Sequence, residues 1–266
     1  MNSAALHIEA LDLAYGPHQV LSKLTLAEVP PGSVVGVLGA NGAGKSSLLR
    51  AVARMERAQG ELRLGSLDLL RGRREDLLQH VAYLPQALPQ ASSLRVLEVI
   101  VGVLRATCPG LSAAAREERF HSVLAELQLL PLAMRRLDQL SGGQRQMVGL
   151  AQVLVRRASL MLLDEPTSAL DLRWQMQTLH ALRAAARDRG AIVCLAMHDL
   201  NLAARHCDRL VVLGPRGLLA EGPPAAVLRA EVLREAFKVD ARIVQGADQL
   251  PVVLVERAEP FLADSG

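Results

Sequence analysis

The run Gly39-Ala-Asn-Gly-Ala-Gly-Lys45-Ser46 lies between a short apolar stretch and a helical pattern. The apolar stretch, residues 33–38, is rich in valine and is preceded by Pro30-Pro31-Gly32, which predicts a buried strand. After the run, apolar residues at positions 48, 49 and 52 recur at helical spacing. A strand, a glycine-rich loop and a helix in this order form the context in which the pattern GxxxxGK[ST] binds phosphate.

The residue types of this loop suit a nucleotide. Gly39, Gly42 and Gly44 can adopt backbone angles closed to other residues, so that successive N–H groups turn inward around an anion. The start of a helix behind them adds a partial positive charge. Lys45 would reach the β- and γ-phosphates, and the Ser46 hydroxyl would hold Mg²⁺. The alternative is a flexible glycine-rich loop that ends in Lys-Ser by chance, and the strand and helix around it count against that interpretation.

Composition limits the other classes of protein. The 266 residues are 50% hydrophobic, enough for a sizeable core, and the formal net charge of +3 gives no support for a nucleic-acid partner. Three cysteines without a CxxC spacing indicate neither a disulfide framework nor a zinc site, so we expect a reducing compartment. The N-terminus lacks the pattern of a signal peptide, and no apolar run reaches the roughly 18 residues of a membrane span. At a membrane, another chain would have to cross it.

We expect one α/β domain over residues 1–266, with a mostly parallel core sheet and an antiparallel β layer. The catalytic core would comprise about residues 1–90 and 141–215. An inserted helical subdomain would occupy about residues 91–140, and a C-terminal appendage about residues 216–266. Further elements are predicted by apolar runs and spacing: parallel strands at 160–163, 192–195 and 210–213, another core strand at 81–84, a crossover helix at 172–182 and a final strand at 251–255.

Two adjacent carboxylates, Asp164 and Glu165, follow the apolar run 160–163 directly. In a doubly wound sheet, ligands gather at the carboxyl ends of the strands, so both side chains would lie beside the phosphate loop. Asp164 can then hold Mg²⁺, and Glu165 can orient the attacking water and accept its proton. Alone, such a pair would be an ordinary polar strand exit, but the upstream loop favours the functional interpretation.

A second glycine-containing segment is Leu140-Ser-Gly-Gly-Gln144. Its Ser-x-x-Gln pattern predicts a capping box, with Ser141 as N-cap and Gln144 at the third helical position. Capping does not require two successive glycines, however. Gly142 and Gly143 open the helix N-terminus so that a phosphate can contact the backbone. Both interpretations can hold together.

With these motifs the chain resembles the ATP-binding subunits of ABC transporters over nearly its whole length. Gly39–Ser46 is similar to their Walker A motif, Leu160–Glu165 to the Walker B motif and Leu140–Gln144 to the family signature. Four single positions follow in the family order: Tyr15 at the adenine, Gln86 in the Q-loop, Asp171 in the D-loop and His198 as the switch histidine.

The resemblance implies a P-loop NTPase fold that hydrolyses ATP with Mg²⁺. Two copies would close head to tail, each nucleotide lying between the phosphate loop of one copy and Ser141–Gly143 of the other. Glu165 and His198 would be catalytic, and Ser46, Gln86 and Asp164 would contact the metal. The residues in contact with the nucleotide would be Tyr15, Gly39, Asn41, Gly42, Ala43, Gly44, Lys45, Ser46, Ser47, Gln86, Ser141, Gly142, Gly143, Gln144 and Asp171.

The resemblance also implies the partners. The helical subdomain would receive a coupling helix from an integral permease, which places the chain peripherally at the cytoplasmic face of the inner membrane. A substrate-binding protein would be an indirect partner, and no nucleic acid is expected.

The class of transported substrate is indicated by shorter sequence segments. Thr167–Gln175, Met197–Ala203 and Glu221–Leu228 are similar to segments of importer ATPases for ferric siderophores, haem and cobalamin, whereas Val101–Cys108 departs from their pattern. The alternatives are the ATPase of an exporter or of an importer for another cargo, and a non-transport ABC ATPase. The chain carries one cassette without long coiled coils or zinc modules, which favours transport.

Overall fold

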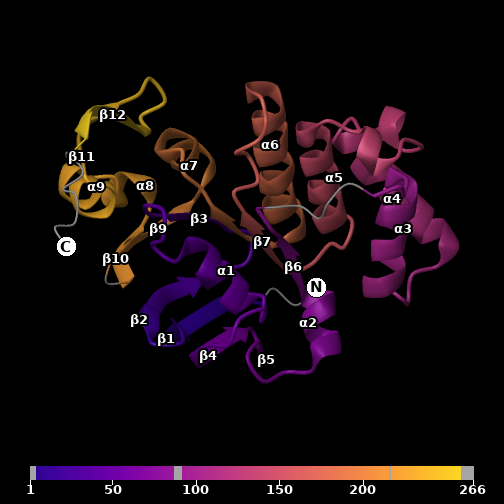
Figure 1. Cartoon of the computed structure of the whole chain (residues 1–266), viewed down its shortest axis with the longest axis horizontal. Coiled ribbons are helices and arrows are strands. Elements are labelled where there is room, and N and C mark those ends of the chain that lie inside the picture. The colour runs from indigo at the N-terminus through magenta and orange to yellow at the C-terminus, as the bar shows by residue number, and fades with distance from the viewer. Residues whose placement is uncertain (1–3, 87–91, 216, 259–266) are drawn as a thin grey trace.

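A six-stranded sheet forms the core of the computed structural model, which describes residues 4–86, 92–215 and 217–258 (Figure 1). The strand order is β10-β9-β3-β8-β7-β6. All neighbours pair in parallel except β10, which is an antiparallel edge strand. The bounds are β3 Val34–Leu38, β6 Val81–Leu84, β7 Leu160–Asp164, β8 Ile192–Ala196, β9 Arg209–Gly214 and β10 Gly217–Gly222.

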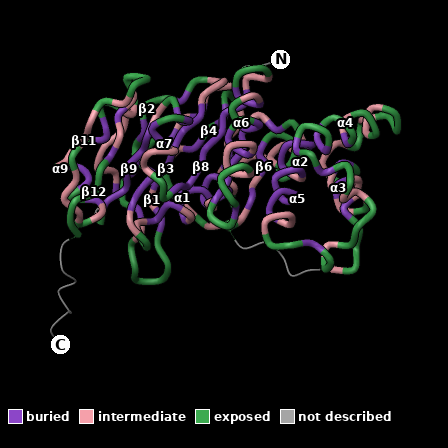
Figure 2. The backbone as a smooth tube through the Cα atoms, turned by 90° about the horizontal axis from the view of Figure 1, so that it is seen from above, coloured by how far each residue is buried: buried purple, intermediate pink, exposed green. Residues whose placement is uncertain are grey.

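The central strands are covered on both faces. Every residue of β3, β7 and β8 is buried, which explains why they read as continuous apolar runs rather than as alternating patterns. Figure 2 shows this buried interior beneath largely exposed outer loops and the exposed surface of α4 (Ala113–Glu126). The predicted parallel core sheet is therefore confirmed.

An antiparallel layer packs against the first helix. Its strand order is β2-β1-β4-β5, with bounds β1 Leu6–Tyr15, β2 His18–Val29, β4 Gln59–Leu64 and β5 Leu67–Asp68. Helix α1 (Lys45–Val52) places Leu48 and Leu49 in one apolar cluster with residues of this layer and of β3. Across the seam, Arg209 donates to the carbonyl of Ala27 at 2.8 Å, and the carboxylate of Glu221 accepts the Ala27 amide at 2.9 Å. The layer is thereby fixed to the core sheet.

The inserted segment is helical, as predicted. It comprises α3 (Val96–Thr107), α4 and the short turns Leu130–Leu132 and Leu137–Gln139, and it precedes α5 (Gly142–Leu154). The side chains of Ile100 and Leu124 are fully buried in the same cluster as Met147 of α5. These helices lie at one end of the molecule (Figure 1).

The C-terminal part lies at the opposite end (Figure 1). Its last two strands form a hairpin, whereas the sequence predicts only one of them, at 251–255. Residues 217–222, which on sequence grounds belong to the appendage, extend the core sheet as β10. The remaining bounds are α2 Arg74–His80, α6 Leu172–Arg189, α7 Leu200–His206, α8 Pro224–Val227, α9 Ala230–Phe237, β11 Val239–Gln245 and β12 Pro251–Ala258. None of the helices in the described ranges combines the length and apolar character needed to cross a membrane.

Candidate active site

The glycine-rich loop connects β3 to α1 and has the backbone that the sequence predicts. Gly44 is the N-cap of α1 in a left-handed conformation, with φ of +95°, and none of the described side chains caps this helix start. At Gly39, with φ of +153°, an added Cβ would lie 2.6 Å from the carbonyl oxygen of Leu213 in β9. Glycine is thus required by close approach to the sheet, and the uncapped N–H groups of α1 remain available for an anion.

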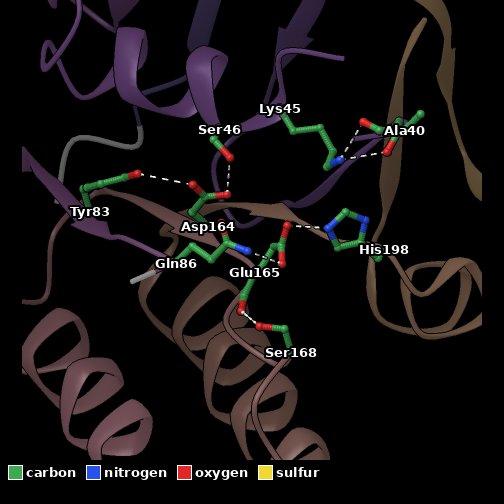
Figure 3. Close-up of polar contacts among 10 residues, drawn as sticks. Ala40, Lys45, Ser46, Tyr83, Gln86, Asp164, Glu165, Ser168 and His198 are labelled. Atoms are coloured by element: carbon green, nitrogen blue, oxygen red, sulfur yellow. Dashed lines mark hydrogen bonds and ion pairs between the residues drawn. The ribbon is translucent and has the colours of Figure 1, made fainter. Parts of the chain in front are cut away.

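Lys45, the first residue of α1, lies inside this loop. Its side chain is buried, and Nζ donates to the carbonyls of Gly39 at 2.8 Å and Ala40 at 3.0 Å. Burial lowers the pKa of Lys45, while the charges of Glu165 and Asp164 act in the opposite direction. The ammonium group is therefore held at the loop by carbonyl oxygens and faced by two carboxylates, a position that suits phosphate binding (Figure 3).

Asp164, the last residue of β7, accepts two hydroxyl groups. Ser46 Oγ donates to Oδ1 at 2.8 Å, and the Tyr83 hydroxyl donates to Oδ2 at 3.4 Å. Burial, together with the neighbouring Asp164 charge, raises the pKa of Tyr83 to about 12. Hydroxyl and carboxylate oxygens side by side are the hard ligands that Mg²⁺ prefers, so Ser46 and Asp164 fit this ion.

Glu165 lies where three loops meet (Figure 3). Its carboxylate accepts the side-chain amide of Gln86 at 2.8 Å and forms a short contact with Nε2 of His198. Its own carbonyl accepts the Ser168 hydroxyl at 3.1 Å. The side chain is only 12% exposed. A carboxylate held in this way beside the phosphate loop can act as a general base for an attacking water.

The rim of the loop contains the predicted aromatic residue. Tyr15 ends β1, is 40% exposed, and donates its hydroxyl to Ser47 Oγ at 3.3 Å. Asn41 is exposed and Ala43 half-buried in the loop itself. The hydroxyl of this exposed aromatic residue is therefore held beside α1.

The second glycine segment does form a capping box. Ser141 Oγ accepts the Gln144 amide at 3.2 Å, and the Gln144 side chain accepts the Ser141 amide at 3.0 Å. A Cβ at Gly142 would meet open space. Asp171 caps α6 through its carboxylate alone, which accepts the Trp174 amide at 2.9 Å. Within the described residues, no hydrogen bond or ion pair joins these groups to the cluster around Glu165.

Comparison with known proteins places this geometry in a family. A family model described as ABC transporter matches residues 23–168. The hemin import ATP-binding protein HmuV of Pseudomonas entomophila is 41% identical over 245 residues, which cover 90% of this chain and 94% of the relative. Its namesake in Bordetella parapertussis is 38% identical over 248 residues with the same coverage. The chain belongs to the ABC transporter family.

Solved structures agree with this assignment of the ABC ATPase. One neighbour is a metal-chelate type ABC transporter in an inward-facing conformation, with a TM-score of 0.78 and 25% identity over 96% of this chain and 98% of the other. A second is an ATP-binding subunit of an ABC transporter, with a TM-score of 0.77 and 27% identity over 87% of this chain and 95% of the other. The predicted fold is confirmed, and the chain is an ATP-binding, ATP-hydrolysing enzyme of the family.

Three contacts in this ABC ATPase were not predicted. Tyr83 bonds Asp164, Ser168 bonds the Glu165 carbonyl, and the Ala40 carbonyl holds Lys45. The signal for Tyr83 was present in the sequence, because a lone hydroxyl in an otherwise apolar strand two residues before a proline needs a polar partner. The other two contacts depend on loop conformation, which spacing does not reveal. Gln86, predicted as a metal ligand, donates here to Glu165.

Proposed function

We propose that this ABC ATPase energises the import of haem, or of a closely similar iron chelate, across the cytoplasmic membrane. The observation that carries the proposal is its sequence identity of 38–41% to hemin import ATP-binding proteins over 94% of their length. The solved neighbour of metal-chelate type supports the same cargo class. Siderophore and cobalamin import are the nearest alternatives within that class.

The residues of one copy supply most of the chemistry. The loop amides and Lys45 bind the phosphates, and Ser46 with Asp164 holds Mg²⁺, which when bound neutralises charge on the phosphate oxygens. Glu165 orients water and accepts its proton, with its carboxylate positioned by Gln86 and His198. Tyr15 stacks on the adenine.

A second copy completes the site in this proposal. Ser141 and Gly142 are exposed, and the N-terminus of α5 is open beside Gly142. They lie outside the hydrogen-bonded cluster of their own copy, so they are free to meet the γ-phosphate bound by another. Backbone and hydroxyl donors at this point would stabilise the charge that develops during hydrolysis, which makes hydrolysis dependent on closure of a head-to-tail dimer.

The permease would dock into a groove next to Gln86. Two adjoining cavities of about 480 and 770 Å³ share Tyr83, Pro85 and Arg156 in their walls. Apolar residues of α3 and α5 line the first cavity, and Met55 and Leu78, which are 61% and 43% exposed, lie at the second.

Cations accompany this apolar groove, namely Arg54, Arg74, Arg145 and Arg156. A helix with apolar residues and a carboxylate is the complement to such a surface. Gln86 follows Pro85 directly and bonds Glu165, so the docked helix would be connected to the ATP site by two residues.

The test is uptake by intact cells. A strain lacking this gene should lose haem uptake, and the wild-type gene, but not the Glu165→Gln variant, should restore it. Ferric siderophore and cobalamin uptake are measured in parallel to separate the cargoes. Unchanged haem uptake in the deletion strain would contradict the proposed cargo, and co-purification from membranes would identify the permease that the subunit serves.

A further inference from the structure

The C-terminal hairpin is joined to the switch-histidine segment by a paired contact. Asn201, in α7, donates from Nδ2 to the carbonyl of Val253 at 3.2 Å, and the Val253 amide donates to Asn201 Oδ1 at 2.8 Å. Val253 lies in the middle of β12, opposite Ile243 of β11, and is buried. Its N–H and C=O therefore point away from β11 and toward α7. The side-chain amide of Asn201 thus makes the two backbone hydrogen bonds that a neighbouring strand would make with Val253.

Hydrogen bonds hold the backbone between this contact and His198. The Met197 amide donates to the Val37 carbonyl in β3 at 3.1 Å, which fixes the chain on one side of the histidine. On the other side, the Asp199 carboxylate accepts the amides of Asn201 and Leu202, both at 2.9 Å. The backbone on both sides of His198 is therefore held, by β3 before the histidine and by the start of α7 after it.

The hairpin is itself anchored to the core. Helix α9 packs beside β11, with Leu233 fully buried in the main apolar cluster. Arg234 of that helix forms two hydrogen bonds with Asp240 in β11, at 2.9 and 2.6 Å. Because β11 pairs with β12, a hairpin fixed by α9 can hold α7 in place.

We propose that Asn201 is a positioning residue for ATP hydrolysis: through Val253, the C-terminal hairpin holds α7 and so keeps His198 against Glu165. The proposal rests on the proposed roles of Glu165 and His198. The side-chain amide of asparagine offers a donor and an acceptor in one plane, which this contact uses. Leucine has the size of asparagine and neither group, and aspartate retains only the acceptor.

The test is a double-mutant cycle on the full-length chain. Asn201→Leu should lower kcat about tenfold, the order of magnitude expected from losing two neutral hydrogen bonds, with ATP affinity unchanged. Asn201→Asp should give a smaller loss. In a His198→Ala background, Asn201→Leu should have no further effect, because the residue acts through the histidine. Arg242→Ala serves as the control, since this exposed residue of the same hairpin pairs with Glu256 and should leave kcat unchanged.

Hydrogen exchange supplies a readout that needs no turnover. Residues 196–203 should exchange faster in Asn201→Leu than in the wild type or in Arg242→Ala. Unchanged exchange there, or an equal loss of kcat with and without His198, would overturn the proposal. A wild-type chain that hydrolyses no ATP would contradict the proposed function instead, and the exchange comparison would still decide whether Asn201 holds the segment.

Discussion

At the scale of single residues, the adjacent carboxylates of Asp164 and Glu165 contact different groups. Asp164 is still in β7 and points its carboxylate at Ser46. Glu165 has φ of +51°, uncommon for a residue other than glycine, and its amide donates to the Ala196 carbonyl at 3.1 Å. The turn directs the second carboxylate to Gln86 and His198. Adjacent acids therefore serve different partners, one suited to a metal ion and one to water.

Replacing Glu165 tests the base directly. Glu165→Gln keeps the size and the hydrogen-bonding reach of the side chain but cannot accept a proton, so we expect hydrolysis to fall roughly 10²–10⁴-fold with ATP binding retained. Phosphate release and equilibrium nucleotide binding are the measurements. Glu75→Gln, at an exposed glutamate of α2, is the control. Turnover equal to that of the control would remove Glu165 from this role.

Tyr83 should leave a signature at alkaline pH. Its pKa is about 12 in the fold against 10.0 ordinarily, so the folded state favours the protonated phenol. The resulting stabilisation is complete below about pH 10 and is lost as pH rises toward 12. The free energy of unfolding should thus fall over this range by about 1–3 kcal/mol more in the wild type than in Tyr83→Phe. Urea unfolding across the range measures this, and parallel curves for the two proteins would argue against the assignment.

At the scale of elements, Ser141 at the start of α5 combines a helix cap with a proposed phosphate contact. The Ser141 hydroxyl accepts the Gln144 amide, and among the residues that the structure describes its own proton has no acceptor. Serine and aspartate cap helices about equally well, but aspartate has no proton to donate. The capping function and the proposed phosphate contact can therefore be separated by one substitution.

Ser141→Asp should preserve stability within about 0.5 kcal/mol, because the cap is kept. Hydrolysis should fall at least about tenfold, since a carboxylate would face the γ-phosphate of the opposing copy. The matched control is Ser112→Asp at α4, where Ser112 accepts the Ala115 amide at 3.1 Å in the same way. Thermal unfolding and ATPase rates measure both effects. Equal rates for the two variants would refute the cross-dimer contact.

The sequence predicts an element correctly where its pattern depends only on residues that are close together in the chain. The strand of continuous apolar residues at 160–163, the glycine loop and the cap at Ser141 each depend on neighbours within a few positions. The hairpin partner β11 was not predicted, because it is half-exposed along its length and shows no clean alternation. Contacts such as that between Tyr83 and Asp164 join residues 81 positions apart and become visible only in the fold.

At the scale of the whole molecule, the proposed permease groove and the ATP site lie on either side of one short segment. Tyr83 and Pro85 line the groove, while Tyr83 also bonds Asp164 and Gln86 bonds Glu165. A partner that shifts this segment would alter both carboxylates together. In the proposed coupling, the permease groove and the ATP site are therefore connected through these five residues.

Negative charges in the proposed permease groove should prevent the permease from binding to the ATPase. The double variant Met55→Glu with Leu78→Glu places carboxylates on two exposed apolar side chains, so we expect stability within about 0.5 kcal/mol of the wild type and a normal ATPase rate for the isolated subunit. Co-purification with membrane proteins should be lost. The control is Leu254→Glu on the distant hairpin, also exposed. Retained co-purification in the groove variant would place the permease contact elsewhere.

The order of strands in the core sheet has a further consequence for behaviour at high concentration. In the part of the chain that the structure describes, β6 at one border has four residues and is followed by Pro85, and β10 at the other border has an irregular register and contacts β2. Short, interrupted or covered borders do not template the addition of foreign strands. The core sheet thus offers neither of its two borders to a strand of another copy.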